Sequence, residues 1–398
     1  MYPEFKHVPS SMEKETWREK NIRLFGVDLS FSDVPEWKRT KHVHRLHPYL
    51  GKFIPQLAEI FLRKYFKLGE TVLDPFAGSG TTLVEASVLG INSIGIDISK
   101  FNCLLSRVKT DDYSIHLMQK EVGDILQKTE QFSKAYLQNK GQTNLNGSTP
   151  HFETESIYLN EWFAPRALQE ILFYRSLIPN YHYQDLLKVI LSRSTRSARQ
   201  IPHYDLARPK KPVKEPYYCH KHSRICTPVD ECLKFLVRYS YDTIKRIKEF
   251  SRLKKSVKIE IVHGDSRTVK LNQIIDGVFT SPPYVGLINY HEQHRYAYEL
   301  FDFEEKEGEE IGPEFKGQSR SAITAYKEDM KKVLCNISNY IKEGGLVFIV
   351  VNDKYNIYPE IGKSNGLELL DTIKRPVTRR TSIDTNEFYE DILMFVRR

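Results

Sequence analysis

The sequence lacks any apolar run approaching the roughly 18 residues that a membrane span needs. Its first residues, MYPEFKHVPSSMEKE, contain no apolar segment of the kind found in a secretion signal, so we expect a cytoplasmic protein. Cysteine is scarce as well: the five cysteines are odd in number and mostly scattered, which is typical of a reducing compartment and argues against a disulfide framework. The 398 residues, 40% hydrophobic and 28% charged, are enough for two or three domains.

Charge is unevenly distributed along the chain. The formal net charge is +8, but residues 186–258 alone contain 19 Lys and Arg against 6 Asp and Glu, a local charge of +13 that leaves −5 for the rest. A local excess of this size favours a polyanionic partner over a general role in solubility.

The pattern of apolar residues divides the chain into blocks. Residues 40–110 predict a βαβ unit preceded by a helix over 54–66, with strands over 71–73 and 92–96. Residues 111–254 break this alternation with helical runs over 165–177 and 183–194 and a proline-broken stretch over 202–228. From residue 257 the alternation resumes, with strands over 258–262, 276–280, 346–351 and 391–396 and a helix over 325–341.

This order predicts an α/β protein with a doubly wound, Rossmann-like sheet that a largely helical insertion interrupts. The expected divisions are an N-terminal extension over 1–39, a catalytic domain over 40–110 and 255–398, and an inserted domain over 111–254.

A glycine turn, DPFAGSGTT at 74–82, follows the first strand and opens a helix. Glycines let the backbone approach a ligand there, and the amide groups at the helix start face it. A dinucleotide fingerprint would need a third glycine where Leu83 stands, and a P-loop would need Gly-Lys-Ser/Thr. A merely structural turn is the remaining alternative.

Two acidic residues end further strands. Asp97 stands about 20 positions after the glycine turn, where an acidic side chain can accept hydrogen bonds from both hydroxyls of a ribose. Asp265 ends the next strand along the chain and could accept from an adenine amino group, although alone it would equally suit a helix N-cap. Because the strand ends meet at one edge, the set favours a nucleoside site.

The tetrapeptide Ser281-Pro282-Pro283-Tyr284 follows the apolar strand at 276–280 and therefore lies at the same edge. Two prolines fix the backbone and remove amide donors, which leaves carbonyl acceptors. Such acceptors, with the Ser281 hydroxyl, would favour the pyramidal nitrogen that an exocyclic amino group adopts when it attacks. Tyr284 would give an extruded base a face to stack on. A rigid loop with a structural tyrosine is the alternative.

Together, DPFAGSGTT, the GID that ends at Asp97, and TSPPY at 280–284 resemble the motifs of the amino-methylating DNA methyltransferases, which make N4-methylcytosine or N6-methyladenine. HPYLGKFIP at 47–55 is similar to a further cofactor-binding motif of that family. The resemblance covers about 40–110 and 257–396. It implies S-adenosylmethionine as cofactor, double-stranded DNA as substrate, association with the nucleoid, and a cognate restriction endonuclease as a candidate partner.

The resemblance also implies roles for individual residues. The expected catalytic residues are Ser281, Pro282, Pro283 and Tyr284. The expected cofactor-binding residues are Lys52, Phe53, Asp74, Pro75, Phe76, Gly78, Ser79, Gly80, Thr81, Asp97, Ile98, Asp265 and Ser266.

Serine at the first position of the tetrapeptide is typical of the N4-cytosine members, whereas Asp or Asn is usual for N6-adenine. N6-adenine methylation stays open as the alternative, followed by an RNA amino-methyltransferase and an inactive DNA-binding module. Methylation of a ring carbon is disfavoured, because that reaction needs a nucleophilic cysteine, normally after a proline, and no cysteine here follows a proline.

The basic insertion is interpreted as the DNA target-recognition domain, with arginines and lysines placed to meet phosphates or guanine edges. The expected DNA-binding residues are Arg193, Arg196, Arg199, Arg208, Lys210 and Lys211. Cys219, His220, His222 and Cys226, with Cys232 beyond, are ligand types suited to zinc, but their spacing is not that of a standard knuckle and basic neighbours also suit phosphate contact. The sequence therefore assigns no metal site.

Overall fold

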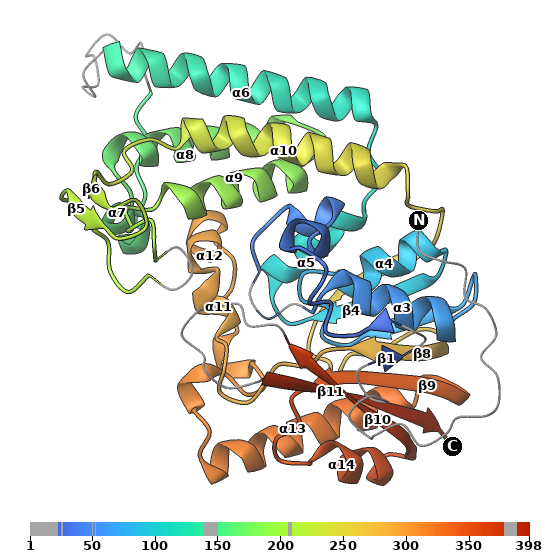
Figure 1. Cartoon of the computed structure of the whole chain (residues 1–398). Helices are drawn as coiled ribbons and strands as arrows, with labels where there is room; N and C mark the ends of the chain where they lie inside the picture. Colours follow the sequence, from blue (N-terminus) through green and yellow to red (C-terminus); the bar gives the residue numbers. More distant parts are fainter. Residues whose placement is uncertain are drawn as a thin grey trace.

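A seven-stranded sheet forms the centre of the computed structural model (Figure 1). The structure describes residues 23–24, 27–49, 51, 53–138, 150–205, 209–377 and 388–398. The strand order is β10-β11-β9-β8-β3-β4-β7. The five strands from β9 to β7 are parallel to one another, and β11 runs antiparallel to both β9 and β10. The strand bounds are β3 Thr71–Asp74, β4 Asn92–Asp97, β7 Ile259–His263, β8 Ile275–Thr280, β9 Ile341–Val351, β10 Leu367–Val377 and β11 Phe388–Arg397.

Helices cover both faces of this sheet because its central strands are apolar on both sides. Alternate residues of a strand point to opposite faces. Val72 and Phe279 pack with helix α3 (Pro55–Tyr65), and their neighbours Leu73 and Val278 pack with helix α13 (Arg320–Ser338). Helices α4 (Thr81–Leu89) and α5 (Lys100–Thr110) follow strands β3 and β4, and α14 (Tyr358–Ser364) lies beside α13 (Figure 1).

The inserted segment forms a layer of helices above the sheet (Figure 1). Its helices are α6 Ile115–Gln138, α7 Ile157–Trp162, α8 Pro165–Leu177, η2 Ile178–Asn180, α9 Gln184–Ala198 and α10 Leu233–Ser251. Their apolar faces share one core cluster with α5 and with α12 (Arg295–Phe301), so this layer is packed directly on the elements around the sheet. A short hairpin, β5 (Tyr217–Cys219) and β6 (Arg224–Cys226), projects from it.

Smaller elements complete the described chain. They are β1 Arg23–Leu24, β2 Val27–Asp28, α2 Glu36–Arg39, η1 His42–Arg45, α11 Tyr290–Gln293, η3 Glu307–Glu309 and η4 Glu314–Lys316. None of the described helices is both long enough and apolar enough to span a membrane.

The predicted fold class is confirmed: the sheet is Rossmann-like and a largely helical segment interrupts it. The helix expected over 325–341 is wrong at both ends. Ser319 caps α13 by accepting a hydrogen bond from the Ala322 amide, so the helix begins earlier, and Ile341 already belongs to strand β9. The domain boundaries remain predictions.

Candidate active site at the carboxyl edge of the sheet

A cavity lies where the carboxyl ends of β3, β4, β7 and β8 meet. This edge is where open α/β sheets bind their ligands. Of the residues assigned to the cofactor from sequence, the structure brings the following to the cavity wall: Phe53, Pro75, Phe76, Gly78, Ser79, Thr81, Asp97, Ile98, Asp265 and Ser266. From the tetrapeptide, Ser281 and Pro283 also line it. Lys52 falls outside the described residues.

Asp97 is held by the elements that it joins. Its Oδ2 accepts a hydrogen bond from the Gly78 amide at 2.8 Å, and its Oδ1 accepts from the Ser99 amide at 2.8 Å and from the Asn102 side chain at 3.0 Å. Burial raises the pKa of this carboxyl group to about 6, against the hydrogen bonds that favour the ionised form. The side chain is therefore fixed at the cavity wall, with Oδ2 able to accept a further donor.

The glycine turn has the backbone geometry that its sequence suggests. Gly78 and Gly80 have φ values of 51° and 78°, which side chains rarely allow, and a Cβ at Gly80 would lie 2.8 Å from Ser106 Oγ. Two buried polar atoms on the wall, Ser79 Oγ and Asn102 Oδ1, have no hydrogen-bond partner among the described residues. A ligand that carries several polar groups would satisfy them, and the charged methionine part of S-adenosylmethionine fits this requirement.

Asp74 does not line the cavity but lies behind it, 1% exposed. Its carboxylate accepts from Thr82 at 2.6 Å, from Thr280 at 2.7 Å and from the Phe76 amide at 3.1 Å. Burial raises its pKa to about 6. Asp74 thus links the glycine turn to Thr280, the residue that begins the TSPPY segment. It holds these two segments together behind the cavity wall. Gly80, the N-cap of α4, also stands outside the wall.

Asp265 faces the cavity while it is paired with Arg267, whose Nε lies 3.0 and 2.8 Å from the two carboxylate oxygens. The Arg267 side chain also donates to the Glu309 carbonyl and forms an ion pair with Asp329 at 3.1 Å. The carboxylate is thereby oriented but still open toward the cavity. Neighbouring Ser266 contacts the Pro75 carbonyl across the same edge.

The tetrapeptide forms a wall between two hollows. Ser281 and Pro283 face the first cavity, and Tyr284 lines a second, smaller hollow together with Asn352, Asp353 and Tyr355. The Pro283 carbonyl accepts a hydrogen bond from the Tyr326 hydroxyl at 2.8 Å. Pro282 is buried within the loop.

Tyr284 is anchored through its hydroxyl, which donates to Glu390 at 2.9 Å. Glu390 in turn accepts two hydrogen bonds from Arg375, whose guanidinium also donates to the Leu29 carbonyl. Burial, with the Glu390 carboxylate as a second cause, holds the pKa of Tyr284 well above its ordinary value. The ring is therefore fixed as a neutral phenol at the edge of the second hollow.

Several wall residues were not identified from sequence. Tyr290, Glu309, Glu310 and Ile311 come from the segment after the tetrapeptide, where charged residues and glycines gave no periodic signal. His291 is bonded to Glu310 and holds this segment against the cavity. Ser99 and Asn102 also line the wall, and their place just after Asp97 at the start of α5 could have indicated them. So could Tyr49 and Gly51, which lie in the HPYLGKFIP motif.

The predicted DNA-binding residues fall into two groups. Arg193 forms an ion pair with Asp242 at 2.7 Å and lies over the Tyr239 ring, and Arg199 is 5% exposed and lies over the Tyr296 ring. Arg196 is partly buried, and this burial lowers its pKa. These three arginines thus have partners inside the protein. Lys210 and Lys211 are exposed, and Arg208 is outside the described residues.

Comparison with known proteins gives concordant matches. A family model described as DNA methylase matches residues 4–107. The type II methyltransferase M.MjaII of Methanocaldococcus jannaschii is 41% identical over 96% of this chain and 85% of its own length. M.BsoBI of Geobacillus stearothermophilus, also a type II methyltransferase, is 26% identical over 75% of this chain and 57% of its own.

Two more matches are proteins that are named as RNA methyltransferases. A tRNA (guanine(10)-N2)-dimethyltransferase of Methanocaldococcus jannaschii is 28% identical, over 24% of this chain and 29% of its own. Among solved structures, the rRNA methyltransferase aviRa of Streptomyces viridochromogenes aligns over 94% of this chain and 96% of its own, at 10% identity and a TM-score of 0.34.

Proposed function

Because this chain belongs to the amino-methylating type II DNA methyltransferase family, we propose that it methylates the N4 amino group of a cytosine turned out of double-stranded DNA. S-adenosylmethionine is the methyl donor, and it supplies a methyl group bound to a positively charged sulfur. The observation that supports the choice of cytosine is Ser281, which stands at the cavity wall in the first position of the tetrapeptide. Serine there is typical of the N4-cytosine members.

The tetrapeptide supplies acceptors for the target amino group. The nitrogen lone pair of an exocyclic amine is delocalised into the base, so the amine attacks only when its N–H bonds are held out of the ring plane. The Ser281 hydroxyl and the Pro282 carbonyl are our candidates for these acceptors, whereas the Pro283 carbonyl already accepts one hydrogen bond from Tyr326. They are fixed before the base arrives, because Thr280 is tied to Asp74 and prolines restrict the loop.

The second hollow is our candidate for the base pocket. Tyr284 offers a ring that its bond to Glu390 holds in place, and Tyr355, Asn352 and Asp353 add a further aromatic side chain and polar groups to the wall. A base that leaves the duplex gains stacking and hydrogen bonds in such a pocket. Since the tetrapeptide separates the two hollows, a base here and a donor in the first cavity would meet at Ser281.

The inserted segment is proposed to contact the DNA. The exposed Lys210 and Lys211 are suited to phosphate contact. Arg193 and Arg199 instead interact with side chains of the protein itself.

A cognate restriction endonuclease is proposed as a partner by analogy with type II systems. N6-adenine is the alternative target; an RNA target is less favoured, because the RNA enzyme resembles this chain over a much shorter stretch than M.MjaII does.

Mass spectrometry of nucleosides tests this proposal directly. The full chain is expressed in a host without DNA methylation, beside the Ser281→Ala variant, and the genomic DNA is digested to nucleosides. N4-methylcytosine that disappears in the variant is the expected result. N6-methyladenine would move the target to adenine, and DNA free of both marks while the purified enzyme methylates RNA would overturn the assignment to DNA.

A further inference from the structure

The β5–β6 hairpin of the inserted segment is too small to be stable through its own packing. Each strand has three residues, and two-stranded hairpins of any length are marginal in water. Side chains along it are turned outward: Tyr218 is 51% exposed and Ile225 is 65% exposed. Two residues point the other way, since Cys219 is fully buried and Cys226 is 7% exposed. Something other than an apolar core must hold this hairpin, and these two thiols are the inward-facing groups.

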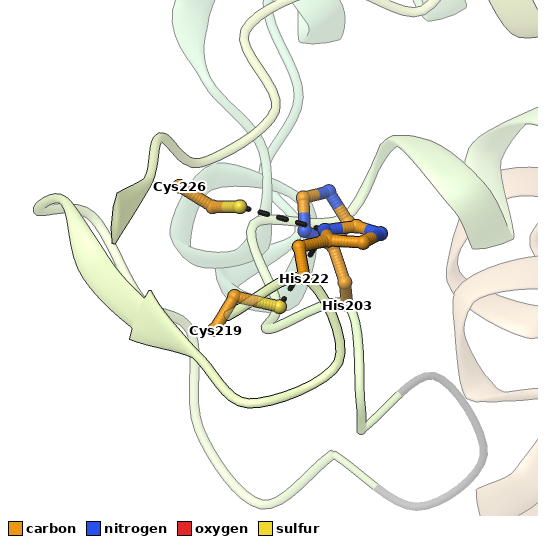
Figure 2. Close-up of side chains that lie close together, drawn as sticks. All are labelled: His203, Cys219, His222 and Cys226. Atoms are coloured by element: carbon orange, nitrogen blue, oxygen red, sulfur yellow. Dashed lines mark hydrogen bonds between the residues drawn. The ribbon is translucent and has the colours of Figure 1, made fainter. Parts of the chain in front are cut away.

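Four side chains with metal-binding atoms meet beneath the hairpin. They are His203, Cys219, His222 and Cys226, and one ligand atom from each lies within 4.8 Å of all the others (Figure 2). Both cysteine sulfurs approach the same nitrogen, Nδ1 of His222, at 3.6 Å from Cys219 and 3.5 Å from Cys226. Figure 2 shows both thiols directed at the His222 ring, with the His203 ring next to it.

These separations match tetrahedral zinc coordination. With Zn–S near 2.3 Å and Zn–N near 2.0–2.1 Å, a tetrahedral angle puts a sulfur and a nitrogen ligand about 3.6 Å apart. We propose that His203, Cys219, His222 and Cys226 bind a Zn²⁺ ion. Two thiolates and two imidazoles are a set that zinc prefers, and they balance the ion's charge without a further anion.

The surroundings of His203 fit a ligand role. Its Nδ1 lies 3.0 Å from the Tyr217 hydroxyl, and its backbone amide donates to the same oxygen at 3.0 Å. Zinc-bound histidines usually donate their second ring N–H to such a group, which fixes the tautomer and the orientation of the ring. With Nδ1 engaged by Tyr217, Nε2 is the nitrogen that remains to coordinate the metal. Tyr217 stands on β5, so the hairpin and its turn supply three ligands, Cys219, His222 and Cys226, and also orient the fourth.

The four ligands close the coordination sphere, so the ion is structural. A catalytic zinc keeps a position open for water, and no fifth group is needed here to complete a tetrahedron. The ligand pattern, His-x₁₅-Cys-x₂-His-x₃-Cys, links residue 203 after helix α9 to the hairpin and so closes the proline-rich loop between them. Metal binding would stabilise the loop and the hairpin together.

A second cluster of possible metal ligands among the described residues lacks the features of a metal site. His42, His44 and Glu85 also lie within reach of a common ion, but Lys41 Nζ already contacts Glu85 at 2.8 Å, and His44 Nε2 contacts its other oxygen at 2.7 Å. A lysine cation occupies the place of a metal there, and the group lacks the thiols that zinc favours. No comparable cation takes that place among the described residues of the hairpin cluster, where the ligands contact one another and Tyr217.

Metal content of the purified full chain tests the proposal. Elemental analysis after dialysis should find about one zinc per chain. Cys219→Ser and His222→Asn should lose most of it, and His203→Asn should release it to a weaker chelator. His220→Asn is the matched control, because His220 neighbours the ligands in sequence but is outside the cluster, and Cys335→Ser controls for loss of an exposed thiol. Zinc that is absent from the parent protein, or retained in His222→Asn, would overturn the proposal.

Cobalt spectroscopy keeps the test independent of whether the variants fold. Zinc in the parent protein is removed with a chelator and Co²⁺ is added back. Intense visible bands of tetrahedral Co²⁺ with near-ultraviolet thiolate charge transfer, complete at about one equivalent, are expected. The weak spectrum of octahedral Co²⁺ or a spectrum without thiolate bands would overturn the assignment. Because neither readout depends on methyl transfer, their outcome is separate from that of the proposed function.

Discussion

The sheet edge and the inserted helices both carry many polar side chains, but these side chains are satisfied in different ways. At the edge, Asp97 and Asp265 are oriented by the protein and still face a cavity. In the insertion, Arg193 and Arg199 lie against rings and carboxylates of the protein itself. A buried polar group needs a partner, so the identity of that partner separates ligand-binding groups from structural ones. Structural groups also occur at the sheet edge: Asp74 belongs to the DPFAGSGTT motif, but its hydrogen-bond partners are all within the protein.

The largest expected effect is at the edge, where Ser281 lines the cavity and is proposed to hold the target amino group. Ser281→Ala should lower kcat by about 10²–10³-fold, as loss of one fixed hydrogen-bonding group from a transition state does in other enzymes. Affinity for S-adenosylmethionine should change much less. Methyl transfer to DNA measured with labelled cofactor, together with calorimetric titration, separates the two quantities. Ser251→Ala, at the exposed end of α10, is the control. An unchanged kcat would exclude Ser281 as an acceptor.

The next effect concerns Asp97, whose carboxyl group has a pKa of about 6 because burial disfavours its ionised form. If Asp97 accepts hydrogen bonds from the ribose hydroxyls, as the sequence predicts, cofactor binding requires its ionised form. Affinity should therefore be full above pH 6 and fall as the pH drops below it, approaching tenfold for each unit. Asp97→Asn should weaken binding by about 10–100-fold, since a hydrogen bond to a charged group contributes roughly 1.5–3 kcal/mol.

Titration calorimetry at several pH values checks this prediction. In Asp97→Asn the dependence near pH 6 should disappear. If it survives, Asp74 is the group responsible, because its pKa is also about 6 and it would still titrate in the variant. That outcome would place the ionisation behind the wall of the cavity and not at the ribose.

The same contrast explains which features could be predicted from sequence. The sheet edge is built from short contiguous motifs at strand ends, and parallel topology alone brings such ends together. Twelve predicted residues, ten assigned to the cofactor and two to catalysis, meet at one cavity for this reason. Motifs do not show which way a side chain points: Asp74 turns toward Thr82 and Thr280, and Tyr284 faces the second hollow.

Features that depend on contacts between residues far apart in the sequence could not be predicted from local sequence patterns. Strand β10 was missed because its exposed residues do not form an apolar run, although pairing with β11 fixes it. In the insertion, the sequence grouped His220 with the cysteines because it is adjacent to Cys219. The structure replaces it with His203, which folding of the proline-rich loop brings near. Charge counting likewise could not distinguish Lys210 on the surface from Arg199 in the interior.

The free energy of unfolding distinguishes arginines that pack inside the protein from arginines that contact DNA. Arg193→Ala removes an ion pair with Asp242 and the packing on Tyr239, so it should lower the free energy of unfolding by about 1–2 kcal/mol. The loss is limited because Arg246 also pairs with Asp242. Urea denaturation measures it. The salt dependence of DNA binding should stay as in the parent protein, and a shallower dependence would make Arg193 a phosphate contact after all.

The smallest expected effect is that of the exposed lysines, and it should be the reverse of the Arg193 result. Each phosphate contact contributes about −0.9 to the slope of log K against log salt concentration on duplex DNA. Lys210→Ala with Lys211→Ala should therefore make the slope less steep by about 1–2 and leave the free energy of unfolding unchanged, because neither side chain is buried. Fluorescence anisotropy with a labelled duplex at several salt concentrations measures the slope, and Arg193→Ala serves as the matched control. If the lysine variant keeps the parent slope, the basic loop does not contact phosphates, and the DNA must approach the sheet edge over another surface.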